Sequence, residues 1–160
     1  MSSARVITAL IRPGLEADLD NPAIGGPIGE YRPQLAAVMR SHAGLVLVAE
    51  VDSEIVGRIT LGCNGNDADI SGFVVIKRCR RQGIGTTLMD AAETEGRRRG
   101  CTRLRLTVAK DNAGAIALYA ARGYRRVAEG VSAGLRTPEG VVVHEPEPVW
   151  EMIKPVPAGI

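Results

Sequence analysis

The stretch ADISGFVVIKRCRRQGIGTTLMDAAETEGRRRGCTRLRLTV, residues 68–108, decides the fold. Its first part, residues 68–76, is an apolar run that predicts a strand, and residues 101–108 alternate as a half-buried strand does. Between them, residues 85–99 carry apolar side chains at helical spacing, followed by a glycine suited to a left-handed helix end. The apolar helix positions are Ile84, Leu88, Ala91 and Ala92. A strand, a crossover helix and a second strand form a right-handed unit, so the two strands should be parallel.

The flanking segments predict antiparallel pairing around this unit. Residues 45–51 and 54–62 are apolar strands separated only by Asp52 and Ser53, the length of a tight hairpin connection. Further strands are predicted at residues 4–11, 124–130 and 149–154, and helices at 34–41 and from Asp111 or Asn112 to Gly123. Residues 20–33 hold three prolines and three glycines and predict a surface loop.

These elements predict a single domain over residues 1–160 of the α/β class. We expect a mixed, mostly antiparallel twisted sheet of about six or seven strands, with helices on both faces. The chain has 160 residues, 45% of them hydrophobic, which suits one compact core. No apolar run approaches the ~18 residues of a membrane span, and the first residues lack the order of a secretory signal. We therefore expect a cytoplasmic protein without a membrane partner.

Charge and cysteine usage exclude several function classes. The net charge is +2, and there are only one Phe, one Trp and three Tyr, so little is available for nucleic-acid backbone binding or base stacking. Seven positive charges nonetheless gather in residues 77–81 and 97–99, which could contact a polyanionic small molecule or lie on a solvated surface. Three cysteines without C-x-x-C spacing, and two histidines, argue against a metal site or a disulfide framework.

The residues between the strand and the helix, RRQGIG at 80–85, predict an anion site. A helix N-terminus exposes about four unpaired N–H groups, and glycines let an anion approach them closely. Arg80 and Arg81 add charged donors suited to phosphate oxygens. The third glycine of a dinucleotide-binding G-x-G-x-x-G motif is replaced by Leu88, and no G-x-x-x-x-G-K-[ST] motif occurs. The pattern therefore predicts a pyrophosphate cradle of another kind.

Two segments together carry a family resemblance. The run from Ala68 through Phe73-Val74-Val75 to Arg80–Gly85 resembles the signature segment of the GNAT superfamily of acyl-CoA N-acyltransferases. Downstream, the pattern N-x-x-A-x-x-L-Y-x-x-x-G-Y at residues 112–124 is similar to that superfamily's second signature at its usual separation. The close resemblance covers residues 68–124, and the alternative is a glycine turn and an alanine-rich helix that match by coincidence.

The resemblance implies a site for acetyl-CoA and no metal. The strands that end near Val75 and Val108 would splay apart, and pantetheine would pair with the freed β edge as an extra strand. The residues so implied to bind the cofactor are Phe73, Val74, Val75, Arg80, Arg81, Gln82, Gly83, Ile84, Gly85, Thr86 and Asn112. For Asn112, plain helix capping is an equal and compatible interpretation.

The resemblance also implies catalytic roles. Tyr119 matches the family's general acid for the leaving thiolate, although it could simply pack on the apolar face of its helix. Asp69 lies where many relatives carry a strand Glu that deprotonates the amine, although it could be a solvated acid. In relatives that acetylate protein N-termini the next strand commonly carries a Glu, and Thr107 stands there in this chain.

We therefore expect an N-acetyltransferase that moves an acetyl group from acetyl-CoA to a primary amine by direct attack in a ternary complex. Acceptor specificity should come from residues 20–33 and 130–148, because loops on a rigid scaffold carry specificity. The alternatives are a non-catalytic CoA-binding module of the same fold and, more weakly, an RNA or DNA contact through the basic clusters. By analogy with relatives, the terminal strands could also pair in a homodimer.

Overall fold

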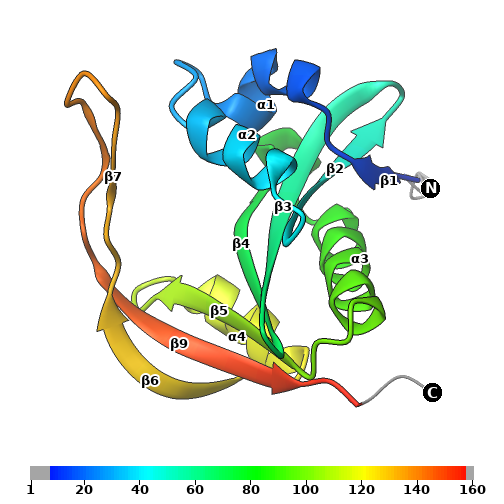
Figure 1. Cartoon of the computed structure of the whole chain (residues 1–160), viewed down its shortest axis with the longest axis vertical. Helices are drawn as coiled ribbons and strands as arrows, with labels where there is room; N and C mark the ends of the chain where they lie inside the picture. The colour runs from blue at the N-terminus through cyan, green and yellow to red at the C-terminus, as the bar shows by residue number, and fades with distance from the viewer. Residues whose placement is uncertain (1–7, 158–160) are drawn as a thin grey trace, which may run out of the picture.

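Seven strands form one twisted sheet in the computed structural model, which describes residues 8–157 (Figure 1). The strands stand in the order β1-β2-β3-β4-β5-β9-β6. Their bounds are β1 Leu10–Pro13, β2 Gly44–Val51, β3 Glu54–Asn64, β4 Asp67–Val75, β5 Arg103–Ala109, β6 Arg125–Val131 and β9 Pro148–Pro155. The helices are α1 Pro22–Gly25, α2 Arg32–Arg40, α3 Ile84–Arg98 and α4 Ala113–Ala121, with short 3₁₀ turns at Glu16–Asp20 and Lys77–Cys79.

The central strand pair is parallel and every other neighbouring pair in this sheet is antiparallel, as the sequence predicted. Strands β4 and β5 run in the same direction and are joined by α3. Strands β2 and β3 form the predicted hairpin, in which Asp52 and Ser53 adopt positive φ angles of 50° and 66°. Gly100 ends the α3 segment with a φ of 83°, which is the predicted left-handed helix end.

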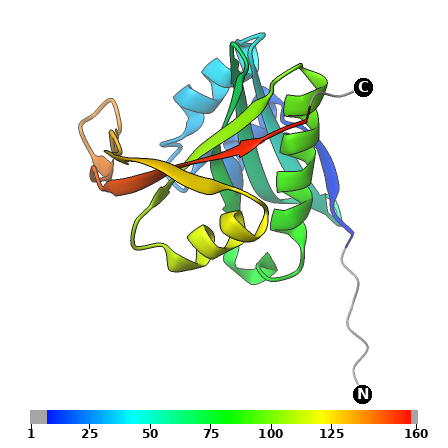
Figure 2. The ribbon, with the colours of Figure 1, turned by 90° about the horizontal axis from the view of Figure 1, so that it is seen from below.

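Helices cover both faces of the sheet, and the alternation of β2 shows why. Val46 and Val48 face one apolar cluster with α1 and α2, whereas Leu47 and Ala49 face a larger cluster with α3 and α4. Viewed from below, α2 and α3 lie on opposite sides of the strands (Figure 2). No helix within residues 8–157 is long and apolar enough to cross a membrane.

The prediction of a surface loop at residues 20–33 is corrected by the structure. It contains α1, and α2 begins at Arg32, two residues before the predicted start. Pro22 stands in the first turn of α1, where a missing N–H costs no hydrogen bond, and the Asn21 side chain caps that helix by accepting from the amide of Ala23 at 2.9 Å. Ile24 is fully buried, so this segment also contributes to the core.

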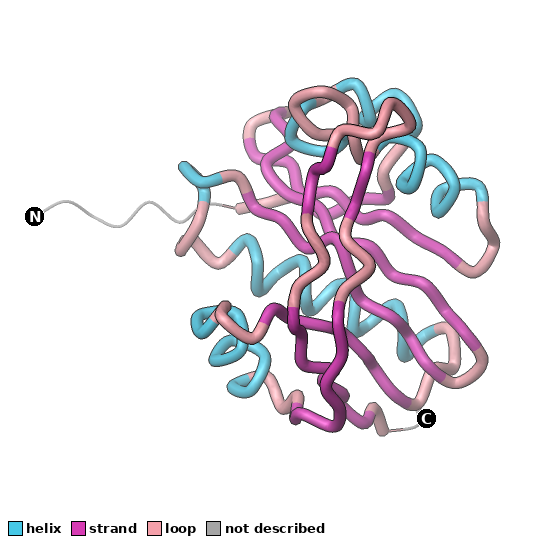
Figure 3. Tube along the Cα trace, turned by 90° about the vertical axis from the view of Figure 1, so that its left-hand side faces the viewer, coloured by secondary structure: helices cyan, strands magenta, loops and turns pink. Residues whose placement is uncertain are grey.

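Two other predictions differ at their edges. The first strand was predicted at residues 4–11. Residues 4–7 lie outside the described part of the chain, and the strand that is described, β1, spans Leu10–Pro13. The long connection 130–148 contains a second, two-stranded sheet formed by β7 Leu135–Arg136 and β8 Val142–His144. Its two arms run side by side from the β6–β9 end of the main sheet toward α1 and α2 (Figure 3).

A buried charge network fastens the end of α4 and strand β9 to α3. The Glu93 side chain accepts from Arg122 at 2.7 Å, from Lys154 at 3.1 Å and from the Tyr124 hydroxyl at 3.0 Å. Burial, followed by the nearby Glu93 carboxylate, raises the pKa of Tyr124 well above its usual range. The phenol therefore stays protonated and keeps donating to Glu93.

Replacing Glu93→Gln should lower the free energy of unfolding by about 3 kcal/mol, because it leaves two cations without their buried carboxylate. Asp90→Asn is the matched control. Asp90 also contacts Arg122, but its side chain is 64% exposed, so its loss should cost less than about 1 kcal/mol. Urea unfolding of the three proteins measures both values. Equal losses in the two variants would show that burial of Glu93 contributes nothing.

Candidate functional site

The paired strands β4 and β5 part after three residue pairs. Asp67, Ala68 and Asp69 pair with residues 103–105, and no further pairing joins the two strands, although β4 continues to Val75 and β5 to Ala109. The outer edges of both strands stay occupied, because β4 pairs with β3 and β5 pairs with β9 along its whole length. The inner edges beyond Asp69 therefore present backbone N–H and C=O groups toward the space between the strands.

A bulge in β4 accompanies this separation. The register between β3 and β4 shifts between Arg58 and Thr60, and Gly72 in the bulge has a φ of 58°. A Cβ atom at Gly72 would lie 2.5 Å from Nη1 of Arg58, which donates to the Gly72 carbonyl at 2.6 Å. Only glycine suits both the backbone angle and this close approach.

The turn from β4 to α3 has the geometry of an anion cradle. Arg81 and Gly83 adopt left-handed φ angles of 61° and 82°, and α3 begins directly after them. Helix geometry leaves the first amides of α3, at Ile84, Gly85 and Thr86, without partners inside the helix. A Cβ atom at Gly85 would lie 3.0 Å from Cζ of Phe73, so the glycine lets the helix start close to β4.

A cavity of about 420 Å³ lies along this turn and the freed edge of β4. We name it the donor cavity, after the acetyl donor that the family resemblance implies here. Of the residues predicted to bind the cofactor, seven line it: Phe73, Val74, Val75, Arg80, Arg81, Gly85 and Asn112. The other four, Gln82, Gly83, Ile84 and Thr86, do not line it. The side chain of Ile84 is buried in the core, so only its backbone could serve an anion.

Arg80 contacts the strand edge directly. Its Nε donates to the carbonyl of Val75 at 2.9 Å. This carbonyl belongs to the segment that the family resemblance assigns to pantetheine, so a ligand that pairs with Val75 would have to displace the Arg80 side chain.

Helix α4 borders the donor cavity at its start. The Asn112 side-chain oxygen accepts from the Ala115 amide at 3.1 Å, so the capping interpretation is confirmed. The same side chain lines the cavity, which leaves its amide group free for a second use. Leu118 also lines the cavity and was not predicted from the sequence.

Tyr119 lies inside the protein rather than on the wall of the donor cavity. It is 8% exposed and packs edge-on against Tyr124, with ring centroids 5.9 Å apart. Its hydroxyl makes no hydrogen bond to any residue within 8–157, and burial raises the pKa of the phenol. The contacts thus agree with the packing interpretation, and the neighbouring Leu118 places the helix turn of Tyr119 beside the cavity.

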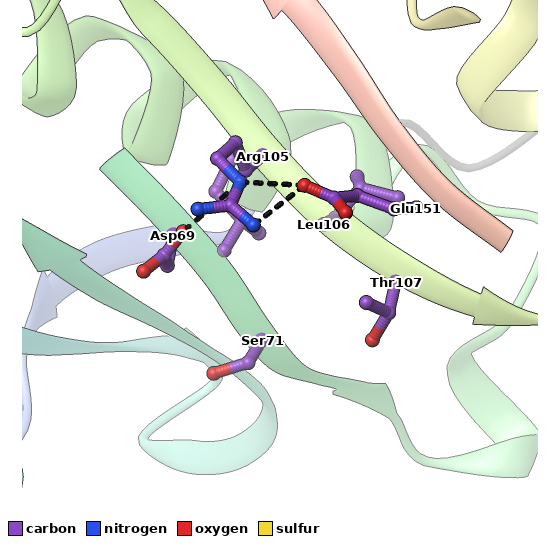
Figure 4. Close-up of a pocket in the computed structure, with 7 residues that line it drawn as sticks. Asp69, Ser71, Arg105, Leu106, Thr107 and Glu151 are labelled. Atoms are coloured by element: carbon purple, nitrogen blue, oxygen red, sulfur yellow. Dashed lines mark hydrogen bonds and ion pairs between the residues drawn. The ribbon is translucent and has the colours of Figure 1, made fainter. Parts of the chain in front are cut away.

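A second cavity, of about 270 Å³, lies where β4, β5 and β9 meet (Figure 4). We name it the acceptor cavity, after the amine acceptor that the family resemblance implies beside Asp69. Residues from all three strands line it: Asp69, Ile70, Ser71, Arg105, Leu106, Thr107 and Glu151. Arg105 lies between the two acids, with its Nη2 2.5 Å from Glu151 and its Nε 3.9 Å from Asp69. The Asp69 side chain is half exposed, so it is open to water and to a ligand.

Arg105 and Glu151 were not predicted from the sequence as site residues. Glu151 enters the site because β9 pairs with β5, which sets Glu151 directly opposite Thr107. The sequence alternation predicts that Arg105 and Thr107 share a face, because Leu104, Leu106 and Val108 occupy the other. Nothing in the sequence pairs the final strand with residues 103–109, so no local signal could have found Glu151.

Comparisons with known proteins agree with this geometry. An aminoglycoside N(6')-acetyltransferase type 1 from Klebsiella aerogenes is 34% identical over 117 aligned residues, covering 65% of this chain and 76% of that protein. A ribosomal-protein-alanine N-acetyltransferase from Brucella melitensis has a similar structure, with a TM-score of 0.71, 24% identity, and coverage of 92% of this chain and 99% of that one.

The PaiA N-acetyltransferase from Thermoplasma acidophilum, solved in complex with coenzyme A, shares the fold with a TM-score of 0.71 at 20% identity. The similarity covers 94% of this chain and all of that one, 100%. Residues 15–124 of this chain match the family model described as the acetyltransferase (GNAT) family. With its parted parallel strands and its two signature segments inside that match, the chain belongs to the GNAT family of acetyltransferases.

Proposed function

We propose that this protein transfers the acetyl group of acetyl-CoA to a primary amine, which attacks the thioester directly in a ternary complex. One observation carries the proposal: consecutive parts of β4 line two cavities. Phe73–Val75 border the donor cavity and Asp69–Ser71 border the acceptor cavity. A thioester lying along the first segment would have its carbonyl carbon near the approach of an amine from the second.

The donor half uses charge and unpaired backbone. Arg81 and the first amides of α3 would hold the pyrophosphate, since both offer donors to phosphate oxygens at a helix N-terminus. The pantetheine amides would pair along Phe73–Val75, and Asn112 would donate its free amide group to the same arm. Arg80 would leave the Val75 carbonyl and join the phosphate contacts.

The acceptor half has to supply a neutral amine. An α-amine with a pKa near 8 is about one-tenth neutral at pH 7, whereas a lysine amine is neutral about once in 2,500 molecules. The neutral amine attacks, and we propose that Asp69 takes, through water, the proton that the nitrogen loses as the C–N bond forms, because Asp69 is half exposed in the acceptor cavity. Arg105 holds Glu151 in a close ion pair, which leaves Glu151 better suited to attract the ammonium form than to remove its proton.

Attack forms the C–N bond and an oxyanion, which a backbone N–H near Val75 would stabilise. Collapse of the tetrahedral intermediate breaks the C–S bond and releases the CoA thiolate. Proton transfer from a phenol of pKa near 10 to a thiolate near 8.5 is uphill by about 2 kcal/mol. Burial raises the pKa of Tyr119 further, so we propose that its hydroxyl stabilises the thiolate by hydrogen bonding as the bond breaks.

Two observations favour an enzyme over a non-catalytic CoA-binding module: the make-up of the acceptor cavity and the name of a relative. The acceptor cavity carries two carboxylates and is open to water, which a module that only binds CoA does not require. The Klebsiella relative is named for acetylating an aminoglycoside nitrogen, which supports an amine acceptor.

Arg81→Ala should weaken CoA binding about 10-fold or more, because it removes a charged donor to phosphate. Arg78→Ala is the matched control from the same basic run, since Arg78 pairs with Glu54 and does not line the donor cavity. Isothermal titration with CoA measures both. The loss in the first variant should shrink as salt is added. Equal affinities for the two variants would contradict the phosphate contact.

Tyr119→Phe should lower kcat about 100-fold while CoA affinity stays within about two-fold. Tyr124→Phe makes the same change on the neighbouring ring. It should lose about 1 kcal/mol of stability with the Glu93 hydrogen bond and keep its kcat. Thiol release from acetyl-CoA with an active amine gives kcat. If Tyr119→Phe retains full kcat, the hydroxyl has no catalytic role.

The pH dependence of kcat/KM should reflect two groups, the acceptor amine at lower pH and Tyr119, whose pKa is raised, at higher pH. With an α-amine acceptor, kcat/KM should rise about ten-fold per pH unit below pH 8 as the neutral amine forms, and then level off. Because the phenol keeps its proton beyond its usual pKa of 10.0, no fall should appear up to pH 9.5. A decline beginning between pH 8 and pH 9 would contradict a protonated Tyr119 in the reaction.

A further inference from the structure

Arg58 is a buried cation without a carboxylate partner among the described residues. It lies on β3, is 4% exposed, and appears in none of the salt bridges among residues 8–157. Its Nε donates to the carbonyl of Ile24 at 3.1 Å and its Nη1 to that of Gly72 at 2.6 Å. The Tyr31 ring lies over the guanidinium at 5.0 Å. Buried charges in proteins are as a rule paired, so neutral carbonyls and one ring leave this cation undercompensated.

Arg58 lines a cavity of about 230 Å³ that the catalytic scheme does not use. Its lining is Tyr31, Gln34, Leu35, Val38, Arg58, Thr60, Ser71 and Gly72. Thr60 is 7% exposed, and its Oγ1 is buried without a hydrogen-bond partner in the described part of the chain. An unpaired buried hydroxyl costs free energy, so a ligand that accepts a hydrogen bond there would relieve that cost. Leu35 and Val38 give the same cavity an apolar wall.

This cavity adjoins the acceptor cavity. Ser71 lines both, and Ser71 lies directly across the strand pair from Thr60. The two segments expected to carry acceptor specificity also meet here. The Tyr31 hydroxyl, from residues 20–33, and Nε2 of His144, from residues 130–148, lie 2.6 Å apart. Figure 3 shows the β7–β8 arms reaching the level of α1 and α2.

We propose that this cavity binds a carboxylate of the acceptor, so that the acceptor is a primary amine bearing a carboxylate, such as an amino acid with an apolar side chain. The inference rests on the proposed acetyltransferase function. The remaining N–H donors of Arg58 and the hydroxyl of Thr60 would bind the carboxylate oxygens. The apolar side chain would contact Leu35 and Val38.

The arrangement of charge along the site supports a zwitterionic acceptor. The acceptor cavity offers Asp69 and Glu151 to a cationic amine, and the adjoining cavity offers Arg58 to an anion. An acceptor that carried amines at both ends would place a cation against a buried arginine, which is unfavourable in a low-dielectric site. Burial lowers the pKa of Arg58, which agrees with a guanidinium that lacks a compensating anion.

The test compares acceptors that differ only in the carboxylate. L-Leucine and 3-methylbutylamine form one pair, and L-phenylalanine and 2-phenylethylamine form another. Each is assayed by thiol release with the wild-type chain, Arg58→Gln and Arg58→Lys. For the amino acids, Arg58→Gln should raise KM at least ten-fold and Arg58→Lys less, while KM for the matched amines should change less than two-fold. The ratio of variant to wild type cancels each acceptor's own pKa.

If KM rose equally for the amino acid and for its matched amine, the proposal would be overturned. Arg58 would then only stabilise the β4 bulge. Thermal unfolding and CoA affinity of each variant separate misfolding from a lost contact. Thr60→Val provides a second test of the same site in case Arg58→Gln does not fold. Its hydroxyl has no partner to lose, so it should fold normally and still raise KM for L-leucine several-fold.

Binding of the product makes the inference independent of turnover. With CoA present, the wild-type chain should bind N-acetyl-L-leucine at least ten-fold more tightly than N-(3-methylbutyl)acetamide, and Thr60→Val should narrow that difference. Equal affinities would overturn the carboxylate site even if both amines are acetylated. A different result would contradict the proposed function and not the carboxylate site. In that case no acceptor would be acetylated, although the chain would bind CoA and would prefer N-acetyl-L-leucine.

Discussion

The unpaired backbone between β4 and β5 determines how the neighbouring strands and the site are arranged. Two parallel strands that start as neighbours would normally continue their ladder, because each unpaired N–H or C=O otherwise has to find another partner. Here β5 is held along its whole length by β9, and β4 is held by β3 and bent at Gly72. The strands are therefore kept apart from outside, and the space between them stays available for a ligand that can pair with a β edge.

Charge divides along the same gap. On the donor side, Arg80 and Arg81 stand beside the start of α3, where the helix dipole adds positive potential. On the acceptor side, Asp69 and Glu151 surround Arg105 and leave an acidic surface for an amine. Arg58 is the exception, a buried cation that no carboxylate within residues 8–157 compensates. A polyanionic donor and an amine acceptor would thus be drawn to consecutive segments of one strand, β4.

Local pattern predicted most of the fold and seven of the eight residues that line the donor cavity. The strand–helix–strand unit, the Asp52-Ser53 hairpin and the cap at Asn112 each depend on residues close in sequence, and the structure confirms them. The surface-loop prediction for residues 20–33 is wrong because proline does not always indicate a loop: Pro22 fits the first turn of a helix. The acceptor side could not be predicted, since Glu151 and Arg58 reach it only through strand pairing that brings distant segments together.

A crystal structure of the chain with bound CoA would show whether the space between β4 and β5 is the cofactor site. We predict that the diphosphate lies against the backbone of residues 81–86 and the pantetheine arm along Phe73–Val75. The sulfur should lie between β4 and β5, within hydrogen-bonding reach of the Tyr119 hydroxyl. A complex in which CoA binds elsewhere, or in which side chains fill the space between the two strands and Tyr119 points away from the sulfur, would contradict it.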